Sequence, residues 1–248
     1  MIPKIIHYCW FGGGKMPTLV EQCIASWHMH MPDWQYRLWN ESNFEIATSP
    51  AYVQQAYQAK KYAFVSDYVR LWALEQEGGV YLDTDVEVLR PLDDLLQDTA
   101  FIGLEESKAL LPGTCVMGCE AHCKWVEDML LTYKGARFML EDGNLDMTTN
   151  VQRMGNAMVK SGLLHKREIQ YLSHWGLRIY THDYFSPITS TRVMRKTKNT
   201  YCIHRFAGSW VDGKKNGIRD WWIVREGINL LVQIKRKIVK LLCHKQSI

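Results

Sequence analysis

The 248-residue chain contains no run of 18 consecutive apolar residues, so the sequence predicts no segment that spans a bilayer. Its first ten residues lack a basic start followed by a long apolar stretch, and we therefore expect no signal peptide. Internal repeats and low-complexity tracts are absent as well. Because the seven cysteines are an odd number, they cannot all pair within the chain. These features together predict a reduced, cytoplasmic protein.

Excess charge of either sign is nearly absent from most of the chain. The net charge is +4, but residues 223–248 alone carry six Lys or Arg and one Glu. The rest of the chain therefore sums to −1, which excludes a general nucleic-acid-binding surface. With 47% hydrophobic residues, the chain can build one globular core. We expect a catalytic domain at 1–222 and a separate basic helix at 223–248.

The C-terminal segment has an amphipathic pattern. On a helical wheel Arg225, Arg236, Lys237 and Lys240 gather on one side, and only Lys235 lies within the apolar arc. The opposite, broad apolar face is made by Val224, Ile228, Leu231, Val232, Ile234, Ile238, Val239, Leu241 and Leu242. This pattern is typical of a helix lying in a membrane interface, and basic residues strengthen contact with anionic lipid. We expect peripheral contact with the inner face of the cytoplasmic membrane. The alternative is a terminal helix packed on the catalytic domain.

The remaining sequence alternates strand and helix patterns, which predicts an α/β fold with a mostly parallel central sheet. The opening strand runs into the loop Gly12-Gly13-Gly14, where backbone can approach a ligand closely. A long helix is ended by Gly78-Gly79 and followed by an apolar strand. The predicted strands are 2–8, 35–39, 80–89, 100–104 and 200–206, and the predicted helices are 20–29, 51–77, 124–133, 151–160 and 223–243.

Two carboxylates stand at Asp83 and Asp85 within the strand predicted at 80–89. On a regular strand, residues i and i+2 share a face, so the two charges would repel unless a cation lies between them. Hard divalent cations prefer such oxygen ligands, and a nucleotide diphosphate can complete the coordination. The pattern therefore predicts a Mn²⁺ or Mg²⁺ site that acts as a Lewis acid on a leaving diphosphate. A solvated acidic strand end is the plain alternative.

Three further features favour a site over a solvated strand end. Asp67 and Arg70 share one face of the preceding helix, where they could contact sugar hydroxyls and phosphate or simply pair with each other. Trp10 adjoins the glycine loop and could stack on a base. A late strand ends at His204, followed closely by Ser209 and Trp210.

The phrases IPKIIHYCWFGG, AFVSDYVRLWALEQEGGVYLDTDVEVLRPLD and IHRFAGSW together resemble glycosyltransferase family 32. This family comprises the DXD sugar-binding-region enzymes of capsule and lipopolysaccharide assembly, and the glucosylating domains of clostridial toxins are more distant relatives. The resemblance implies a GT-A fold that binds a nucleotide-diphosphate sugar. It also implies retaining transfer of a hexose to a glycan or lipid-linked acceptor in surface polysaccharide synthesis.

The resemblance also implies residue roles. Trp10 would stack on the donor base, Asp67 and Arg70 would hold the transferred sugar, and Asp83 would contact ribose or sugar hydroxyls. Asp85 would bind the metal, with Asp83 and His204 beside it. Ser209 and Trp210 would join His204 in closing over the metal and diphosphate. Many relatives carry His-His where this chain has His204-Arg205, and the middle region, including Asn150, matches less well.

Several alternatives stay open at this point. A UDP-hexose is favoured over GDP-mannose as donor, but the sequence does not fix the sugar or the acceptor. A haloacid-dehalogenase-like phosphohydrolase also uses a DxD motif, although there the motif lies near the start of the chain. A non-catalytic sugar- or metal-binding module would keep the same carboxylates. The group Cys115, Cys119, Cys123 and His122 matches no closed zinc framework, so buried thiols are favoured there.

Overall fold

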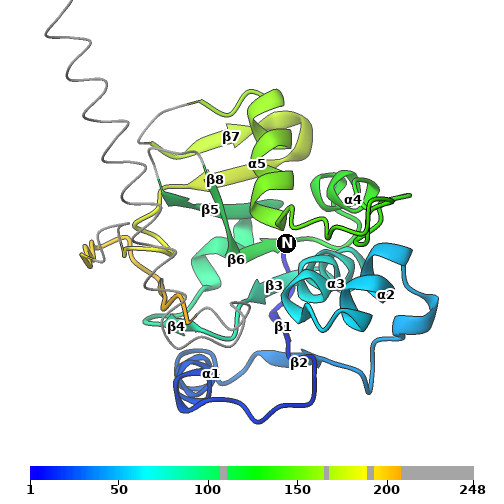
Figure 1. Cartoon of the computed structure of the whole chain (residues 1–248). Coiled ribbons are helices and arrows are strands. Elements are labelled where there is room, and N and C mark those ends of the chain that lie inside the picture. Colours follow the sequence, from blue (N-terminus) through cyan, green and yellow to red (C-terminus); the bar gives the residue numbers. More distant parts are fainter. Residues whose placement is uncertain (107–110, 165–167, 189–192, 208–248) are drawn as a thin grey trace, which may run out of the picture.

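The computed structural model describes residues 1–106, 111–164, 168–188 and 193–207, which form a three-layer α/β domain around a seven-stranded sheet (Figure 1). Strands β2, β1, β3, β5 and β8 run in one direction, and β6 and β7 run in the other. This order confirms the predicted fold class of an α/β domain with a mostly parallel central sheet. In sheet order the strands are β2 (Gln35–Trp39), β1 (Ile5–Cys9), β3 (Gly79–Leu82), β6 (Leu111–Cys119), β5 (Ala100–Glu106), β8 (Leu177–Tyr180) and β7 (Gln170–Leu172).

A second, two-stranded sheet pairs β4 (Val86–Val88) with β9 (Cys202–His204) in antiparallel fashion. The single strand predicted at 80–89 is therefore wrong, because the chain leaves the main sheet after β3 and turns before it enters β4. The backbone N–H of Val86 donates to the carbonyl of Asp83 at 3.0 Å across this turn. The late strand predicted at 200–206 is present but shorter.

In the described part of the chain, five α-helices flank the sheets: α1 (Thr18–His30), α2 (Ala51–Gln58), α3 (Tyr62–Glu77), α4 (Lys124–Leu131) and α5 (Asn150–Lys160). The single helix predicted at 51–77 is wrong, because the chain breaks between α2 and α3. Lys60 adopts a left-handed backbone (φ +57°), which an α-helix cannot contain. Short 3₁₀ segments occur at Ile46–Thr48, Asp93–Gln97 and Ser173–Trp175.

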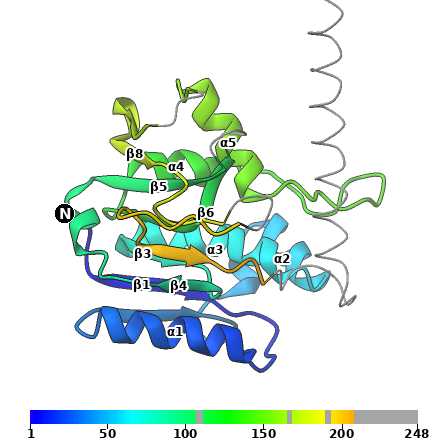
Figure 2. The same ribbon diagram turned by 90° about the vertical axis from the view of Figure 1, so that its left-hand side faces the viewer.

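Alternate side chains of the central strands point to opposite faces of the sheet and into two separate cores. On one face, Tyr81 and Met117 pack with buried residues of α2, α3, α4 and α5. On the other face, Val80 and Val116 pack with residues of α1 such as Trp27, and with β4 and β9. In Figure 2, α1 lies along the outside of this second layer beneath β1 and β4. The central strands are thus covered on both sides.

The connection from α3 to β3 requires both of its glycines. Gly78 has φ +65° and ψ −165°, a conformation that is nearly restricted to glycine. A Cβ atom at Gly78 would lie 2.6 Å from the backbone nitrogen of Ala121, and one at Gly79 would lie 2.7 Å from the carbonyl oxygen of Ile5. This turn places β3 directly beside β1, and so fixes where the segment after β3 begins.

Some sequence-based predictions fall outside the described residues: Ser209, Trp210 and the C-terminal helix at 223–248. No helix in the described ranges combines the length and the apolar sequence that crossing a membrane requires.

Candidate functional site

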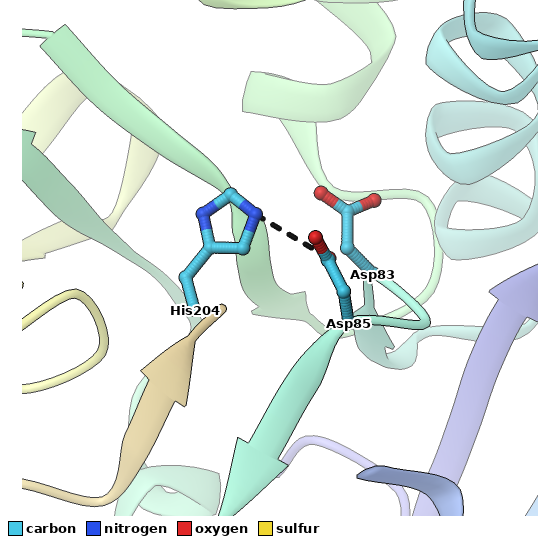
Figure 3. A group of neighbouring side chains, drawn as sticks. All are labelled: Asp83, Asp85 and His204. Atoms are coloured by element: carbon cyan, nitrogen blue, oxygen red, sulfur yellow. Dashed lines mark ion pairs between the residues drawn. The ribbon is translucent and has the colours of Figure 1, made fainter. Parts of the chain in front are cut away.

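Asp83, Asp85 and His204 come together at the carboxyl end of β3, although His204 lies more than a hundred positions after the two aspartates. The two aspartates belong to the turn between β3 and β4, and His204 is the last residue of β9. One ligand atom from each lies within 4.8 Å of the other two (Figure 3). Pairing of β4 with β9 places His204 directly opposite Val86, one residue beyond Asp85. The small second sheet therefore assembles this cluster.

Asp85 is held in place by the segment that follows β9. Its Oδ2 atom accepts a hydrogen bond of 2.7 Å from the backbone N–H of Ala207. Its backbone carbonyl accepts from the N–H of Arg205 at 2.9 Å. The other carboxylate oxygen, Oδ1, lies 3.4 Å from Nε2 of His204. One oxygen of Asp85 is thus anchored, and the other faces the space shared with His204.

Asp83 is held from the opposite side by α3. Its Oδ1 atom lies 3.2 Å from Nη2 of Arg70 and accepts a 3.0 Å hydrogen bond from the Tyr81 hydroxyl. The guanidinium also lies over the Tyr81 ring, 4.5 Å from its centre. Both contacts involve the same oxygen, which leaves Oδ2 of Asp83 without a described protein partner.

Arg70 is 5% exposed, and its hydrogen-bonding groups are used by the protein. Nη1 donates to the carbonyl of Thr114 at 2.8 Å, and Nε donates to the carbonyl of Ser66 at 3.3 Å. Nη2 lies 3.1 Å from Oδ1 of Asp67, in addition to its contact with Asp83. The helix ion pair considered from sequence is therefore present. Arg70 also connects α3, β6 and the turn after β3.

Asp67 is anchored by the start of α5 as well as by Arg70. Its Oδ2 atom accepts a 2.9 Å hydrogen bond from the backbone N–H of Asn150, and the Asn150 side-chain amide donates to the Asp67 carbonyl at 3.1 Å. The first N–H groups of a helix have no partner within the helix and attract negative charge. A capping box made by Thr149 and Gln152 fixes this helix start. Asn150 thus supports Asp67 through one backbone and one side-chain contact.

The two aspartates of the turn differ in acidity. Burial raises the pKa of Asp83, and the nearby Asp85 charge adds to this rise while Arg70 opposes it. For Asp85, burial is outweighed by His204 and by the hydrogen bond from Ala207, so its pKa lies below the usual value. Repulsion between neighbouring carboxylates separates their pKa values in this way. Asp85 is therefore the carboxylate that stays ionised most readily.

His204 has a carboxylate on each side of its ring. Nε2 faces Asp85, and Nδ1 lies 3.4 Å from Oε1 of Glu105 on β5. The ring of Phe206, whose backbone is left-handed (φ +51°), lies 4.0 Å from the imidazole centre. Burial disfavours the imidazolium, but the Cys115 sulfur and the Asp85 carboxylate outweigh it and raise the pKa of His204 well above its usual value.

The residue after His204 is Arg205, which contacts a residue of β4. Its Nε donates to Oε2 of Glu87 on β4 at 2.8 Å. Arg205 therefore ties β9 to β4, and the cluster contains one histidine.

Trp10 and the glycine loop follow β1, the parallel neighbour of β3. Because carboxyl ends of parallel strands meet at one edge of a sheet, Trp10 and Asp83 lie at the same edge. Trp10 is partly exposed, and its indole N–H donates to the Gly14 carbonyl at 2.6 Å. The backbone N–H of Gly12 donates to Glu41 at 2.6 Å, and the Tyr62 ring occupies the space that a Cβ at Gly12 would fill. The glycine loop is therefore held by contacts with Glu41 and Tyr62.

The cysteine group considered for zinc does not form a metal cluster in the described residues. Cys115, Cys119 and Cys123 are buried, whereas the exposed His122 contacts Glu75 through Nδ1 at 2.9 Å. Within the described ranges, the one group of three or more His, Cys, Asp or Glu that could hold a metal is the Asp83–Asp85–His204 cluster.

The donor set of this cluster fits a divalent cation. Two carboxylates and one imidazole nitrogen converge, and two of these groups are largely removed from water. Asp83 keeps one free oxygen, and Asp85 directs one oxygen toward the imidazole. Mn²⁺ and Mg²⁺ prefer oxygen ligands to thiolates. A set of two carboxylates and one imidazole therefore suits these ions better than a set of cysteine thiolates. A cation there would also relieve the repulsion between the two carboxylates.

Three contributors to the site were missed from sequence. The backbone N–H of Ala207 and the carbonyl of Thr114 are invisible because any residue supplies them. Glu105 gives no motif signal, since two adjacent glutamates at the end of a strand, Glu105 and Glu106, have no distinguishing spacing. The pairing of β5 with β6 shifts register between Leu104 and Glu106. This shift indicates the position of Glu105 only once the sheet is known.

Comparison with known proteins finds similarity to glycosyltransferases. Residues 17–102 match the family described as "Glycosyltransferase sugar-binding region containing DXD motif". This segment includes Asp67, Arg70, Asp83 and Asp85, and it confirms the family resemblance drawn from the motifs. Residues 17–102 are thus similar to the DXD sugar-binding region of glycosyltransferases.

Two curated relatives come from Schizosaccharomyces pombe. "Inositol phosphoceramide mannosyltransferase 3" is 34% identical over 108 residues, covering 41% of this chain and 29% of the relative. "Inositol phosphoceramide mannosyltransferase 1" is 28% identical over 111 residues, covering 41% and 33%. The matched part therefore spans about a third of each relative's length.

Similar solved structures are also glycosyltransferases by title. "PaToxG Glycosyltransferase" has a TM-score of 0.46 and 16% identity, and the match covers 65% of this chain and 72% of that one. A glycosyltransferase "involved in the glycosylation of the major capsid of PBCV-1" has a TM-score of 0.45 and 13% identity, with 83% and 95% covered.

Proposed function

We propose that the protein is a divalent-metal-dependent glycosyltransferase that moves a hexose from a nucleotide-diphosphate sugar to a glycan or lipid-linked acceptor. The observation that carries this proposal is the convergence of Asp83, Asp85 and His204 at the carboxyl edge of the sheet. Two of the three residues lie in the segment that matches the DXD sugar-binding region. Retention of the anomeric configuration is proposed from the family resemblance.

The chain's own residues would prepare the site for the donor. Asp85 and His204, with the free oxygen of Asp83, would hold Mn²⁺ or Mg²⁺, which neutralises negative charge on a leaving diphosphate when bound. Arg70 fixes Asp83 and Asp67 in one network, so the carboxylates need not reorganise during the reaction. Trp10, at the same edge of the sheet, offers an aromatic face on which a base can stack.

The names of the fungal relatives bear on donor and acceptor. Both are mannosyltransferases of an inositol phosphoceramide, which supports hexose transfer and a lipid-linked acceptor for this chain. A surface polysaccharide acceptor is the other possibility that the family offers. Stacking on an aromatic ring tolerates any base, so a donor screen must include both UDP-hexoses and GDP-mannose.

Thermal-shift measurements with Mn²⁺ and a panel of nucleotide sugars test this function. A matching donor at 100 times its dissociation constant stabilises the protein by about 2.7 kcal/mol. The expected result is a rise in melting temperature with one class of nucleotide sugar, and a loss of that rise in EDTA. Release of inorganic phosphate from phosphomonoesters, with no response to any nucleotide sugar, would instead indicate a phosphohydrolase. Metal-dependent donor binding without turnover would indicate a binding module.

A peripheral position at the inner face of the cytoplasmic membrane belongs to the same proposal and rests on the sequence of residues 223–248. Co-sedimentation of the full chain with anionic and neutral vesicles tests it. Binding to anionic vesicles that falls with added salt, and falls again when Arg236, Lys237 and Lys240 are changed to Gln, supports membrane contact. Equal recovery in the supernatant with both kinds of vesicle contradicts it.

A further inference from the structure

We propose that Glu105 is a positioning residue that orients His204 as a metal ligand by accepting a hydrogen bond from its Nδ1–H. This inference rests on the proposed metal-dependent function, because it assigns a role in the same site. Glu105 would not itself touch the ion: it is not one of the three residues whose ligand atoms converge.

The first observation is the position of the ring between two carboxylates. Nε2 of His204 faces Asp85 Oδ1 at 3.4 Å, and Nδ1 faces Glu105 Oε1 at 3.4 Å. An imidazole that binds a metal through Nε2 must carry its proton on Nδ1. Glu105 lies on the side of the ring where that proton points.

The second observation is an unsatisfied atom. Nδ1 of His204 is buried and makes no hydrogen bond within the usual geometric limits. A buried nitrogen without a partner costs free energy, and metal-bound histidines almost always donate their other N–H to a carboxylate, a carbonyl or water. A small shift of the Glu105 carboxylate would satisfy this atom.

The third observation explains why Glu105 can reach the ring. On β5, Leu104 pairs with Pro112 and Glu106 pairs with Leu111, so the register shifts at Glu105. Irregularities of this kind redirect a side chain and often lie next to active sites. The Glu105 side chain is 22% exposed, and the His204 side chain is 12% exposed. The pair is therefore partly shielded from water, where a charge-assisted hydrogen bond is stronger than on the surface.

Calorimetric titration of the full-length protein with Mn²⁺ tests this role through three variants. Glu105→Leu removes the acceptor and should weaken Mn²⁺ binding by about 10- to 100-fold, the usual effect of losing such an outer partner. Glu105→Gln keeps an acceptor oxygen and should restore most of the affinity. Glu75→Leu is the matched control, since it breaks the distant carboxylate–imidazole contact between Glu75 and His122 and should leave Mn²⁺ binding unchanged.

The results separate this inference from the proposed function. If the unaltered protein binds no Mn²⁺ or Mg²⁺, the metal-dependent function fails. If it binds Mn²⁺ and Glu105→Leu binds equally well, only the role of Glu105 is overturned, and an equal loss in Glu105→Gln and Glu105→Leu also overturns it.

A second measurement is made on the unaltered protein and does not depend on how the Glu105 variants fold. Histidine ¹⁵N NMR of the unaltered protein with saturating Mg²⁺ reports which ring nitrogen carries the proton, with the signal assigned by its loss in His204→Asn. A proton on Nδ1 is expected. A proton on Nε2 overturns the proposal.

Discussion

The backbone N–H of Ala207 donates to Oδ2 of Asp85 at 2.7 Å, joining two residues that are 122 positions apart. The strand pairing of β4 with β9 brings them together, and the same pairing places His204 beside Asp85. The chain segment after β9 therefore completes the DXD turn. The conformation of this turn therefore depends on residues after β9 as well as on the residues of the turn itself.

Asp85→Asn tests the role of charge in this turn. The Asn side-chain oxygen can still accept from Ala207, so we expect the metal-free protein to stay folded. Because a charged ligand is lost, Mn²⁺ affinity measured by calorimetry should fall steeply. Asp142→Asn, at an exposed carboxylate that contacts Asn144, is the control and should bind Mn²⁺ normally. Normal Mn²⁺ affinity in Asp85→Asn would contradict the ligand assignment.

Arg70→Leu should be strongly destabilising whether or not donor is present. The change leaves the largely buried carboxylates of Asp67 and Asp83 without their cation, and breaking a buried pair from one side costs about 3–5 kcal/mol. Urea unfolding in the absence of ligand measures this loss. Arg37→Leu is the control, because its pair with Glu77 is half-exposed and should contribute less than about 1 kcal/mol. Similar stability of the two variants would rule out a structural role for Arg70.

Gly78→Ala should destabilise the turn that positions β3. The backbone of Gly78 lies in a region that costs other residues about 1–3 kcal/mol, and the added Cβ would also meet the backbone of Ala121. Gly14→Ala provides the comparison, since a Cβ at Gly14 meets no atom within 4 Å. The free energies of unfolding of the two variants should differ clearly, and equal values would show that the α3–β3 turn can relax.

His7 gives the fold a defined pH dependence. It is fully buried, its Nδ1 accepts from the Trp39 indole at 3.1 Å, and its Nε2 lies 2.8 Å from the Gly78 carbonyl. This arrangement requires a neutral ring with the proton on Nε2. Burial lowers the pKa of His7, with smaller opposing effects from the hydrogen bond to Gly78 and the charge of Glu77.

Because its pKa is lower in the folded state, His7 binds a proton more readily when the chain is unfolded. Its contribution to stability is therefore complete above about pH 6.5 and is lost as the pH falls below that value, by at most about 1.4 kcal/mol per pH unit. Urea unfolding between pH 7.5 and 5.5 should show a steeper fall for the unaltered protein than for His7→Gln. Parallel curves would show that His7 is not linked to folding.

Local patterns in the sequence predicted the elements that depend on neighbouring residues. The spacing of apolar residues predicted α1 and β2. Gly78-Gly79 predicted the end of α3, because a glycine that ends a helix is a local signal. The motif also indicated Asp83 and Asp85, and the late strand indicated His204. The convergence of these three side chains follows from the strand order.

Features that depend on distant pairing could not be predicted in this way. The main sheet accepts β6 as an antiparallel strand between β3 and β5, and this position comes from packing against both cores. The split of 80–89 into β3 and β4 depends on β9, which lies more than a hundred residues later. Glu105 is equally invisible, because the register shift that aims it depends on the partner strand β6.

Release of nucleoside diphosphate from UDP-hexoses and GDP-mannose, with Mn²⁺ and then with excess EDTA, tests the central claim most directly. We expect one class of donor to be cleaved in Mn²⁺, with the activity lost in EDTA and nearly absent in Asp85→Asn. Cleavage that continues undiminished in EDTA, or that is unchanged in Asp85→Asn, would contradict a metal-dependent glycosyltransferase built on Asp83, Asp85 and His204.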